Sequence, residues 1–180
     1  MYNKIAITNR KLCFDLLEQI KKLDNSDYSH IILREKDLTL NEYTALAKKA
    51  VEISPKIILH YYTDSCEILN YKKIHLPFYI FKKEIKRLDN FDIVGVSIHS
   101  IDEALEAETL EASYITASHI FETKCKEGLA PKGLKWLEDV CSSVNIPVYA
   151  LGGINEKNAQ SCINSGAFGV CMMSAAMRQF

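Results

Sequence analysis

The residues best suited to chemistry stand where short apolar runs end. His119 follows the run at residues 112–118 and precedes a polar stretch with Thr123, Cys125 and Lys126. An imidazole titrates at about pH 6.5, so it can both accept and donate a proton near neutrality. A solitary histidine is more often structural, and its surroundings alone leave both interpretations open. No partner base is evident for Cys125, which favours an ordinary loop thiol over a nucleophile.

Two cations near the second apolar run are suited to binding an anion. Arg34 and Lys36 alternate along an extended segment, so both side chains point to the same side of it. In the alternative, these cations pair with their acidic neighbours Glu35 and Asp37 at a solvated strand end. The spacing alone favours neither interpretation.

A glycine pair supplies the second candidate for an anion site. Gly152 and Gly153 follow the seventh apolar run and precede residues 154–158, which we expect to begin a helix. Backbone N–H groups exposed by small residues at a helix N-terminus bind phosphate, and Met173 and Ser174 after the last run would supply neighbouring amides. Most glycine pairs are plain turns, but this position in the chain favours a phosphate site.

An alternation of short strands and longer helices must position these residues. Thr39 with Glu42, and Ser100 with Glu103, have the spacing of capping boxes at helix starts. Strands of mostly continuous apolar character joined by helices indicate parallel pairing with both faces covered. The predicted strands are residues 4–8, 29–34, 56–61, 73–78, 92–99, 112–118, 147–151 and 167–173.

Eight such units predict an α/β fold, a small (β/α)8 TIM barrel that residues 1–180 form as a single domain. Too little chain follows residue 173 for a full eighth helix, so we expect a truncated one. A doubly wound open sheet is the alternative, but the first strand lacks the glycine fingerprint of such folds. Because reacting groups lie at the carboxyl ends of barrel strands, Ser97 joins the candidates.

Composition limits the partners of the protein. The 22 Lys and Arg balance 23 Asp and Glu, which leaves no basic field for nucleic acid. No apolar run approaches the ~20 residues of a membrane span, and no signal peptide is recognisable. The six cysteines form no CxxC pair and no zinc spacing. We expect a reduced cytoplasmic protein without nucleic-acid or membrane partners; a homo-oligomer is compatible with the sequence.

Several segments in order along the chain resemble the thiamine phosphate synthase and TenI superfamily of small (β/α)8 barrels. They are LREKDLT at 33–39, VSIHSIDEALEAE at 96–108, SHIFETKCKEGLAPKGL at 118–134, and VYALGGINEKN with SGAFGVCMMSA between 148 and 175. Synthases of this superfamily join a pyrimidine diphosphate to a thiazole phosphate and hold Mg²⁺ with acidic residues after the third and fourth strands. This chain has His60-Tyr61 in place of their Asn-Asp, and HLPFYIF where an Asp follows their HLG. Mg²⁺ needs hard oxygen ligands, and the residues at these two positions do not replace the carboxylates. Mg²⁺ would therefore be a cofactor only if the synthase alternative held.

The motif HIFETKCKEG is instead similar to the TenI branch, whose tautomerases aromatise a carboxythiazole phosphate with the histidine at this position, His119. The resemblance implies an isomerase of thiamine biosynthesis that needs no metal or redox cofactor and whose partner is a phosphorylated thiazole. One departure is the pair Ala117-Ser118 before His119, where a glycine is common. The alternatives are a synthase and a non-catalytic ligand-binding or regulatory protein. The residues assigned to the substrate and its phosphate are Arg34, Lys36, Ser97, Thr123, Lys126, Gly152, Gly153, Met173 and Ser174.

Overall fold

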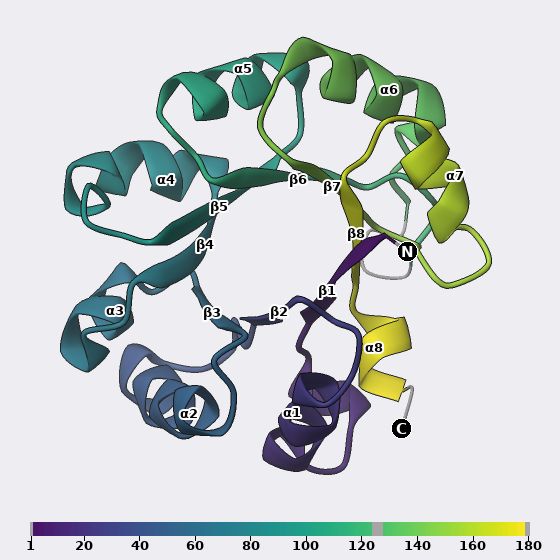
Figure 1. Cartoon of the computed structure of the whole chain (residues 1–180). Helices are drawn as coiled ribbons and strands as arrows, with labels where there is room; N and C mark the ends of the chain where they lie inside the picture. Colours follow the sequence, from purple (N-terminus) through teal and green to yellow (C-terminus); the bar gives the residue numbers. More distant parts are fainter. Residues whose placement is uncertain (1, 124–127, 179–180) are drawn as a thin grey trace.

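The computed structural model, which describes residues 2–123 and 128–178, is a closed barrel of parallel strands surrounded by helices (Figure 1). Each strand pairs with the next, and β8 pairs with β1 through the register Ile5↔Cys171. All eight predicted strands are confirmed, and the open-sheet alternative is wrong because the β1–β8 pairing leaves no sheet edge. The strands are β1 Asn3–Ile7, β2 His30–Leu33, β3 Ile57–His60, β4 Lys73–Pro77, β5 Ile93–Ile98, β6 Tyr114–Ser118, β7 Val148–Leu151 and β8 Gly169–Met172.

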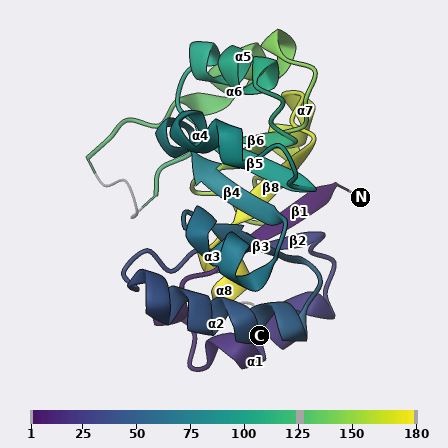
Figure 2. The same cartoon turned by 90° about the vertical axis from the view of Figure 1, so that its left-hand side faces the viewer.

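A helix follows each strand and packs on the outside of the barrel (Figure 2). The last helix, for which a truncated form is expected, has five residues in the described part of the chain, and it packs against β1 and a 3-10 turn. No helix in the described part of the chain is long and apolar enough to cross a membrane. The helices are α1 Leu16–Asp24, α2 Leu40–Ile53, α3 Thr63–Leu69, α4 Phe78–Glu84, α5 Ile101–Thr109, α6 Gly133–Ser143, α7 Ala159–Asn164 and α8 Ser174–Arg178, with 3-10 turns η1 Arg10–Leu12 and η2 Ile85–Arg87.

The two predicted capping boxes start α2 and α5. At α2 the box is complete, because the Thr39 side chain accepts from the Glu42 amide while the Glu42 carboxylate accepts from the Thr39 amide. At α5 the Ser100 hydroxyl accepts from the Glu103 amide, but the Glu103 carboxylate accepts from the amide of His99 at 2.6 Å. This bond ties the end of β5 to the start of α5, beside the mouth of the barrel.

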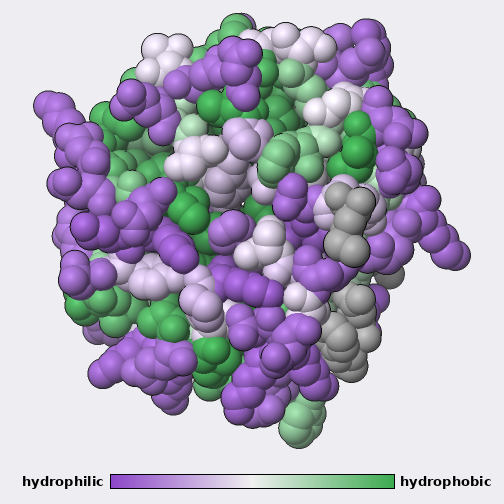
Figure 3. All heavy atoms as spheres, in the orientation of Figure 1, coloured by the Kyte–Doolittle hydropathy of each residue, from purple (hydrophilic) through white to green (hydrophobic). Residues whose placement is uncertain are grey.

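Apolar side chains form one core between the barrel and its helices and another inside the barrel. The inner core consists of Ile5, Ile7, Ile32, Ile58, Tyr114, Tyr149 and Cys171. Hydrophilic side chains make up most of the outline of the molecule (Figure 3). Burial of an Ile side chain contributes about 1.5–3 kcal/mol. The side chains of β4, β5 and β6 that face the interior include polar groups, so the barrel has an apolar wall and a polar wall.

Candidate functional site

A cavity of about 580 Å³ lies at the carboxyl ends of the strands. Its lining contains nearly all of the predicted site residues: Arg34, Lys36, Ser97, His119, Thr123, Gly152, Gly153, Met173 and Ser174. Lys126 and Cys125 lie outside the described residues. The structure therefore brings together residues from five of the eight strand ends.

The cavity has an apolar side and a polar side. Ile7, Ile32, Leu151, Cys171 and Met173 provide apolar surface. Facing them are the polar side chains of strands β3 to β6 and the segment after β6, namely His60, His75, Ser97, His99, Ser118 and His119. The cavity thus offers apolar surface on one side and hydrogen-bonding groups on the other.

The glycine pair adopts a backbone that other residues rarely take. Gly152 has φ 102° and Gly153 has φ 68°. A Cβ on Gly152 would collide with the Cβ of His119, and one on Gly153 would come within 2.8 Å of the Cβ of Phe121. The glycines are therefore needed for close approach to the segment that carries His119, in addition to any contact with a ligand.

The helix expected at residues 154–158 is absent, because α7 begins only at Ala159. Two asparagines direct this stretch into turns instead: the Asn155 amide donates to the Asn158 side chain, and the Asn158 amide group donates to the Gly153 carbonyl. Such side-chain bonds compete with helix formation. The N–H groups of Gly153 and Ile154 have no hydrogen-bond partner among the described residues, so a loop, and not a helix N-terminus, offers donors at this end.

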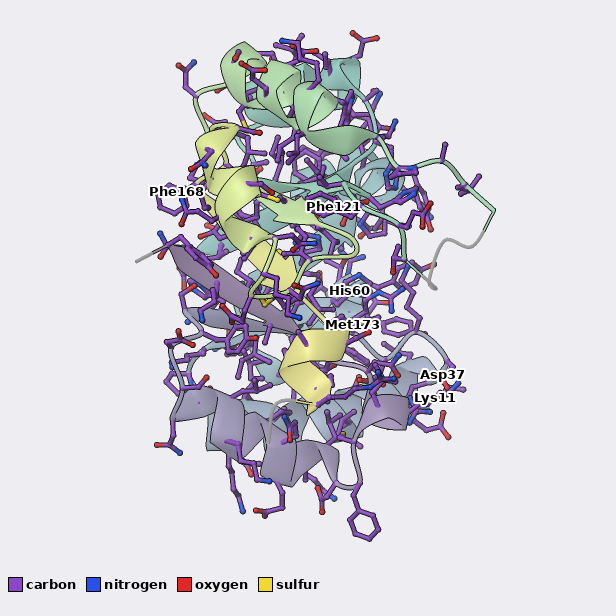
Figure 4. All side chains as sticks on the ribbon, turned by 90° about the vertical axis from the view of Figure 1, so that its right-hand side faces the viewer. Lys11, Asp37, His60, Phe121, Phe168 and Met173 are labelled. Carbon is purple, nitrogen blue, oxygen red and sulfur yellow. The ribbon has the colours of Figure 1, made fainter. Side chains whose placement is uncertain are left out.

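Arg34 and Lys36 both line the cavity, as their alternation predicts. The alternative pairing with their acidic neighbours does not occur for Arg34, whose side chain has no ion-pair partner among the residues that the structure describes. Glu35 and Asp37 instead bind Arg10 from the β1 end, at 3.1 and 2.6 Å. Figure 4 shows Asp37 beside Lys11 at this edge, with His60 and Met173 nearer the middle.

A buried carboxylate fastens the segment that carries these cations. Glu35 is 3% exposed and accepts hydrogen bonds from the Thr8 hydroxyl at 2.7 Å and from the amide and guanidinium of Arg10 at 3.1 Å. The Thr8 oxygen in turn accepts from the Arg34 amide at 2.9 Å. The guanidinium of Arg10 also holds the pKa of the Asp37 carboxyl well below its usual range. This network fixes the backbone from which Arg34 and Lys36 extend.

Sequence reasoning missed a third cation in the lining of the cavity. Arg178 lies in the last turn of α8 and lines the cavity together with Ser174 and Gly153. The only available signal was a basic residue close after the last strand, and the sequence does not tell which face of so short a helix meets the barrel. The described lining of the cavity therefore carries three cations, Arg34, Lys36 and Arg178.

His119 is 5% exposed and lies at the edge of the cavity. Its Nε2 is 3.2 Å from the Leu129 carbonyl. Because a carbonyl only accepts, Nε2 carries the proton in the neutral ring, which leaves the lone pair on Nδ1. The His119 and Ile120 carbonyls accept from the amides of Lys132 and Gly133, so residues 129–133 hold the histidine in place.

The start of α6 adds an aromatic contact to this segment. The ammonium of Lys132 lies 4.7 Å from the centre of the Trp136 ring. The backbone amide of the same lysine donates to the His119 carbonyl at 2.9 Å. Lys132 therefore contacts both the Trp136 ring and the backbone of His119.

Two more imidazoles form the floor of the polar side. The rings of His60 and His75 lie nearly parallel, at 14° with centres 6.0 Å apart. Burial lowers the pKa of His75 to about 3, and nearby Lys36 adds to the effect. Burial, then His75, Lys36 and Arg34, likewise holds the pKa of His60 well below its usual value. Both rings are therefore neutral at physiological pH.

The cavity offers poor ligands for the magnesium of a synthase. Among the described residues, no Asp or Glu lines it, and no group of three or more His, Cys, Asp or Glu side chains could hold a metal. The nearest acidic side chain on the cationic segment, Glu35, is occupied by Arg10 and Thr8. Mg²⁺ prefers carboxylate and other oxygen ligands, so the donor set does not fit it.

The fold and the site define a (β/α)8 barrel with a cavity at its mouth that is lined by cations, histidines and a glycine pair. The chain belongs to the thiamine monophosphate synthase family, TMP-TENI, whose model matches residues 5–176. At the level of the family it is thus an enzyme of thiamine biosynthesis. The relatives reported below are named thiamine-phosphate synthases, which favours the synthase over the expected TenI-type tautomerase.

Named relatives cover most of the chain. The putative thiamine-phosphate synthase 2 of Aquifex aeolicus is 37% identical over 175 residues, 94% of each chain. The thiamine-phosphate synthase of Clostridium acetobutylicum is 34% identical over 187 residues, 98% of this chain and 87% of that one. The structure of a thiamine phosphate pyrophosphorylase from Pyrococcus furiosus superposes with a TM-score of 0.84 at 26% identity, covering 98% of this chain and 88% of that one.

Proposed function

We propose that the protein aromatises a carboxythiazole phosphate by proton transfer through His119. The observation that carries this proposal is a buried histidine whose Nδ1 has no hydrogen-bond partner among the described residues, beside a cavity whose described lining has cations and no carboxylate. A general acid–base reaction needs a group of this kind and no metal. The TenI-like motif around His119 supports the same choice.

The reaction moves one proton and releases none. Nδ1 of His119 takes the proton from the ring carbon that bears the carboxylate, and the resulting imidazolium gives a proton to the exocyclic alkene carbon. The Leu129 carbonyl accepts from Nε2 throughout and stabilises the imidazolium. The product is the aromatic ring, which supplies the thermodynamic drive.

The three cations in the described lining of the cavity match the two anionic groups of this substrate. The phosphate would bind the amides of Gly153 and Ile154 with Ser174 and Arg178. The carboxylate would face Arg34 and Lys36, which extend from the segment after β2. Neutral His60 and His75 add no charge to the cavity.

The second candidate is a thiamine-phosphate synthase, which the names of the relatives favour over the tautomerase. Against it stands the chemistry of the lining, because a diphosphate leaving group normally needs Mg²⁺ and the described cavity offers no carboxylate to hold it. A synthase would have to stabilise the diphosphate with cations such as Arg34 and Lys36 in place of a carboxylate-bound Mg²⁺.

The test is His119→Asn, which keeps a hydrogen-bonding side chain of similar shape but cannot transfer the proton. Turnover of the thiazole tautomer should fall roughly 10²- to 10⁴-fold with little change in KM. His30→Asn, a half-buried histidine away from the cavity, is the matched control and should keep full turnover. A folded His119→Asn protein with wild-type turnover would reject the proposal.

Two parallel assays decide between the candidates. Mg²⁺-dependent coupling of the pyrimidine diphosphate to thiazole phosphate by the purified protein would establish the synthase. Binding of the carboxythiazole phosphate without turnover of either substrate set would point to a ligand-binding or regulatory protein.

A further inference from the structure

We infer that Tyr114 and His75 act as a hydrogen-bond relay that makes the Ser97 hydroxyl a donor toward the ligand. The inference deepens the proposed function, on which its ligand chemistry rests, by naming what kind of atom the ligand presents at the polar wall. Tyr114 and His75 are positioning residues, since both act through Ser97.

The relay begins with a buried imidazole that has both nitrogens engaged. His75 is 3% exposed, its Nδ1 is 3.0 Å from the Tyr114 hydroxyl, and its Nε2 is 2.7 Å from the Ser97 hydroxyl. Burial keeps this ring neutral, as its lowered pKa indicates. A neutral imidazole has one N–H donor and one acceptor nitrogen, so the two bonds must run in the same direction through the ring.

The direction is set by the tyrosine. The Tyr114 hydroxyl is buried and has His75 as its one hydrogen-bond partner among the described residues. If Nδ1 donated to it, the phenolic proton would be buried without an acceptor, which is costly. The hydroxyl therefore donates to Nδ1, and the proton of the ring lies on Nε2 and points at Ser97.

Ser97 receives a second bond from the next strand. The Thr116 hydroxyl, which is fully buried, donates to the Ser97 oxygen at 3.1 Å. A serine oxygen has two lone pairs, and His75 and Thr116 occupy both. The remaining polar atom of Ser97 is its own hydrogen, and Ser97 lines the cavity. The hydroxyl is thus held as a donor.

A glycine makes room for the relay. A Cβ on Gly95 would collide with the Tyr114 ring and hydroxyl and with Nδ1 of His75. Gly95 lies within β5 and has ordinary backbone angles, so no turn requires glycine at this position. Glycine is needed here because any side chain would occupy the space of the Tyr114–His75 contact.

The ligand must consequently present an acceptor to Ser97. A carboxylate oxygen or an unprotonated ring nitrogen fits, whereas an N–H group without a free lone pair at this position would meet a second donor. The carboxylate and ring of a carboxythiazole phosphate offer acceptors of this kind. Discrimination of this sort is stronger than apolar contacts provide, because a buried donor is left unpaired by the wrong ligand.

The direct test is nitrogen NMR of the ¹⁵N-labelled protein, with His75→Gln used to assign the His75 signals. Wild type should show a neutral ring protonated at Nε2. In Tyr114→Phe the second tautomer should become populated, moving the two nitrogen shifts toward each other. Tyr149→Phe, which removes the hydroxyl of a neighbouring interior tyrosine outside the relay, should leave the spectrum unchanged. A wild-type proton on Nδ1 would overturn the relay.

A double-mutant cycle tests the effect on the ligand, with carboxythiazole phosphate as probe in calorimetry. Ser97→Ala and Tyr114→Phe should each weaken binding, roughly 5- to 20-fold for the serine, while the double variant binds no more weakly than Ser97→Ala. Melting curves confirm that each variant is folded, and Tyr149→Phe should bind as wild type. Full additivity of the two changes would refute coupling through Ser97. If wild type fails to bind the probe, the proposed function is wrong, and the spectra still decide the relay.

Discussion

Glu35→Gln should strongly destabilise the protein, although the glutamine side chain has nearly the same shape as that of glutamate. The side chain is 2% exposed, and its carboxylate accepts from the Thr8 hydroxyl, the Arg10 amide and the Arg10 guanidinium. Glutamine keeps one acceptor oxygen, while its NH₂ group must face one of these donors. The loss of at least one charge-assisted bond, with a buried donor left unpaired, amounts to about 2–4 kcal/mol.

Asp37→Asn is the matched control on the same arginine. Asp37 contacts Arg10 and Lys11, but its side chain is 44% exposed, so its loss should cost less than about 1 kcal/mol. Urea unfolding of both variants measures the two free energies of unfolding. Calorimetry with carboxythiazole phosphate should also show weaker binding to Glu35→Gln, because the Thr8 hydroxyl that holds the Arg34 amide loses its acceptor. Equal destabilisation by the two variants would show that the buried network does not fasten this segment.

Two other features give predictions that a melting curve or denaturant titration can check. Gly152→Ala should lower both stability and turnover, because its Cβ would meet His119; Gly128→Ala, also at positive φ but with open space around it, controls for backbone strain alone. His75 has a folded pKa of about 3 against about 6.5 unfolded, so the unfolded chain protonates first and stability falls as pH drops below about 6.5. The decline should be shallower in His75→Gln by about 1.4 kcal/mol per pH unit between about pH 6 and 4, and an unchanged slope would mean that His75 is charged in the folded protein.

The fold was predictable because its signals are local. Continuous apolar runs require burial on both faces, and Thr39 and Ser100 mark helix starts through bonds to residues three positions away. The alternation of Arg34 and Lys36 likewise predicts their common direction, since it depends only on the geometry of an extended chain.

Features that depend on distant contacts escaped the sequence. The partner of Glu35 is Arg10, which lies on another β–α loop, and no local pattern indicates it. The helix expected directly after Gly153 does not form there, because the Asn158 side chain binds the backbone of Asn155 and Gly153 and stabilises a turn. The position of Arg178 depends on how α8 packs on the barrel.

The contact between Lys132 and Trp136 gives the protein a built-in optical reporter. Trp136 is the only tryptophan of the chain, so its fluorescence is not mixed with that of another indole. The ammonium 4.7 Å from its ring belongs to the residue whose amide holds the His119 carbonyl. Any ligand that shifts the histidine therefore changes the environment of a single emitter. Titrations of unlabelled protein can follow occupancy of the cavity through emission alone, without a coupled assay and before any turnover is known.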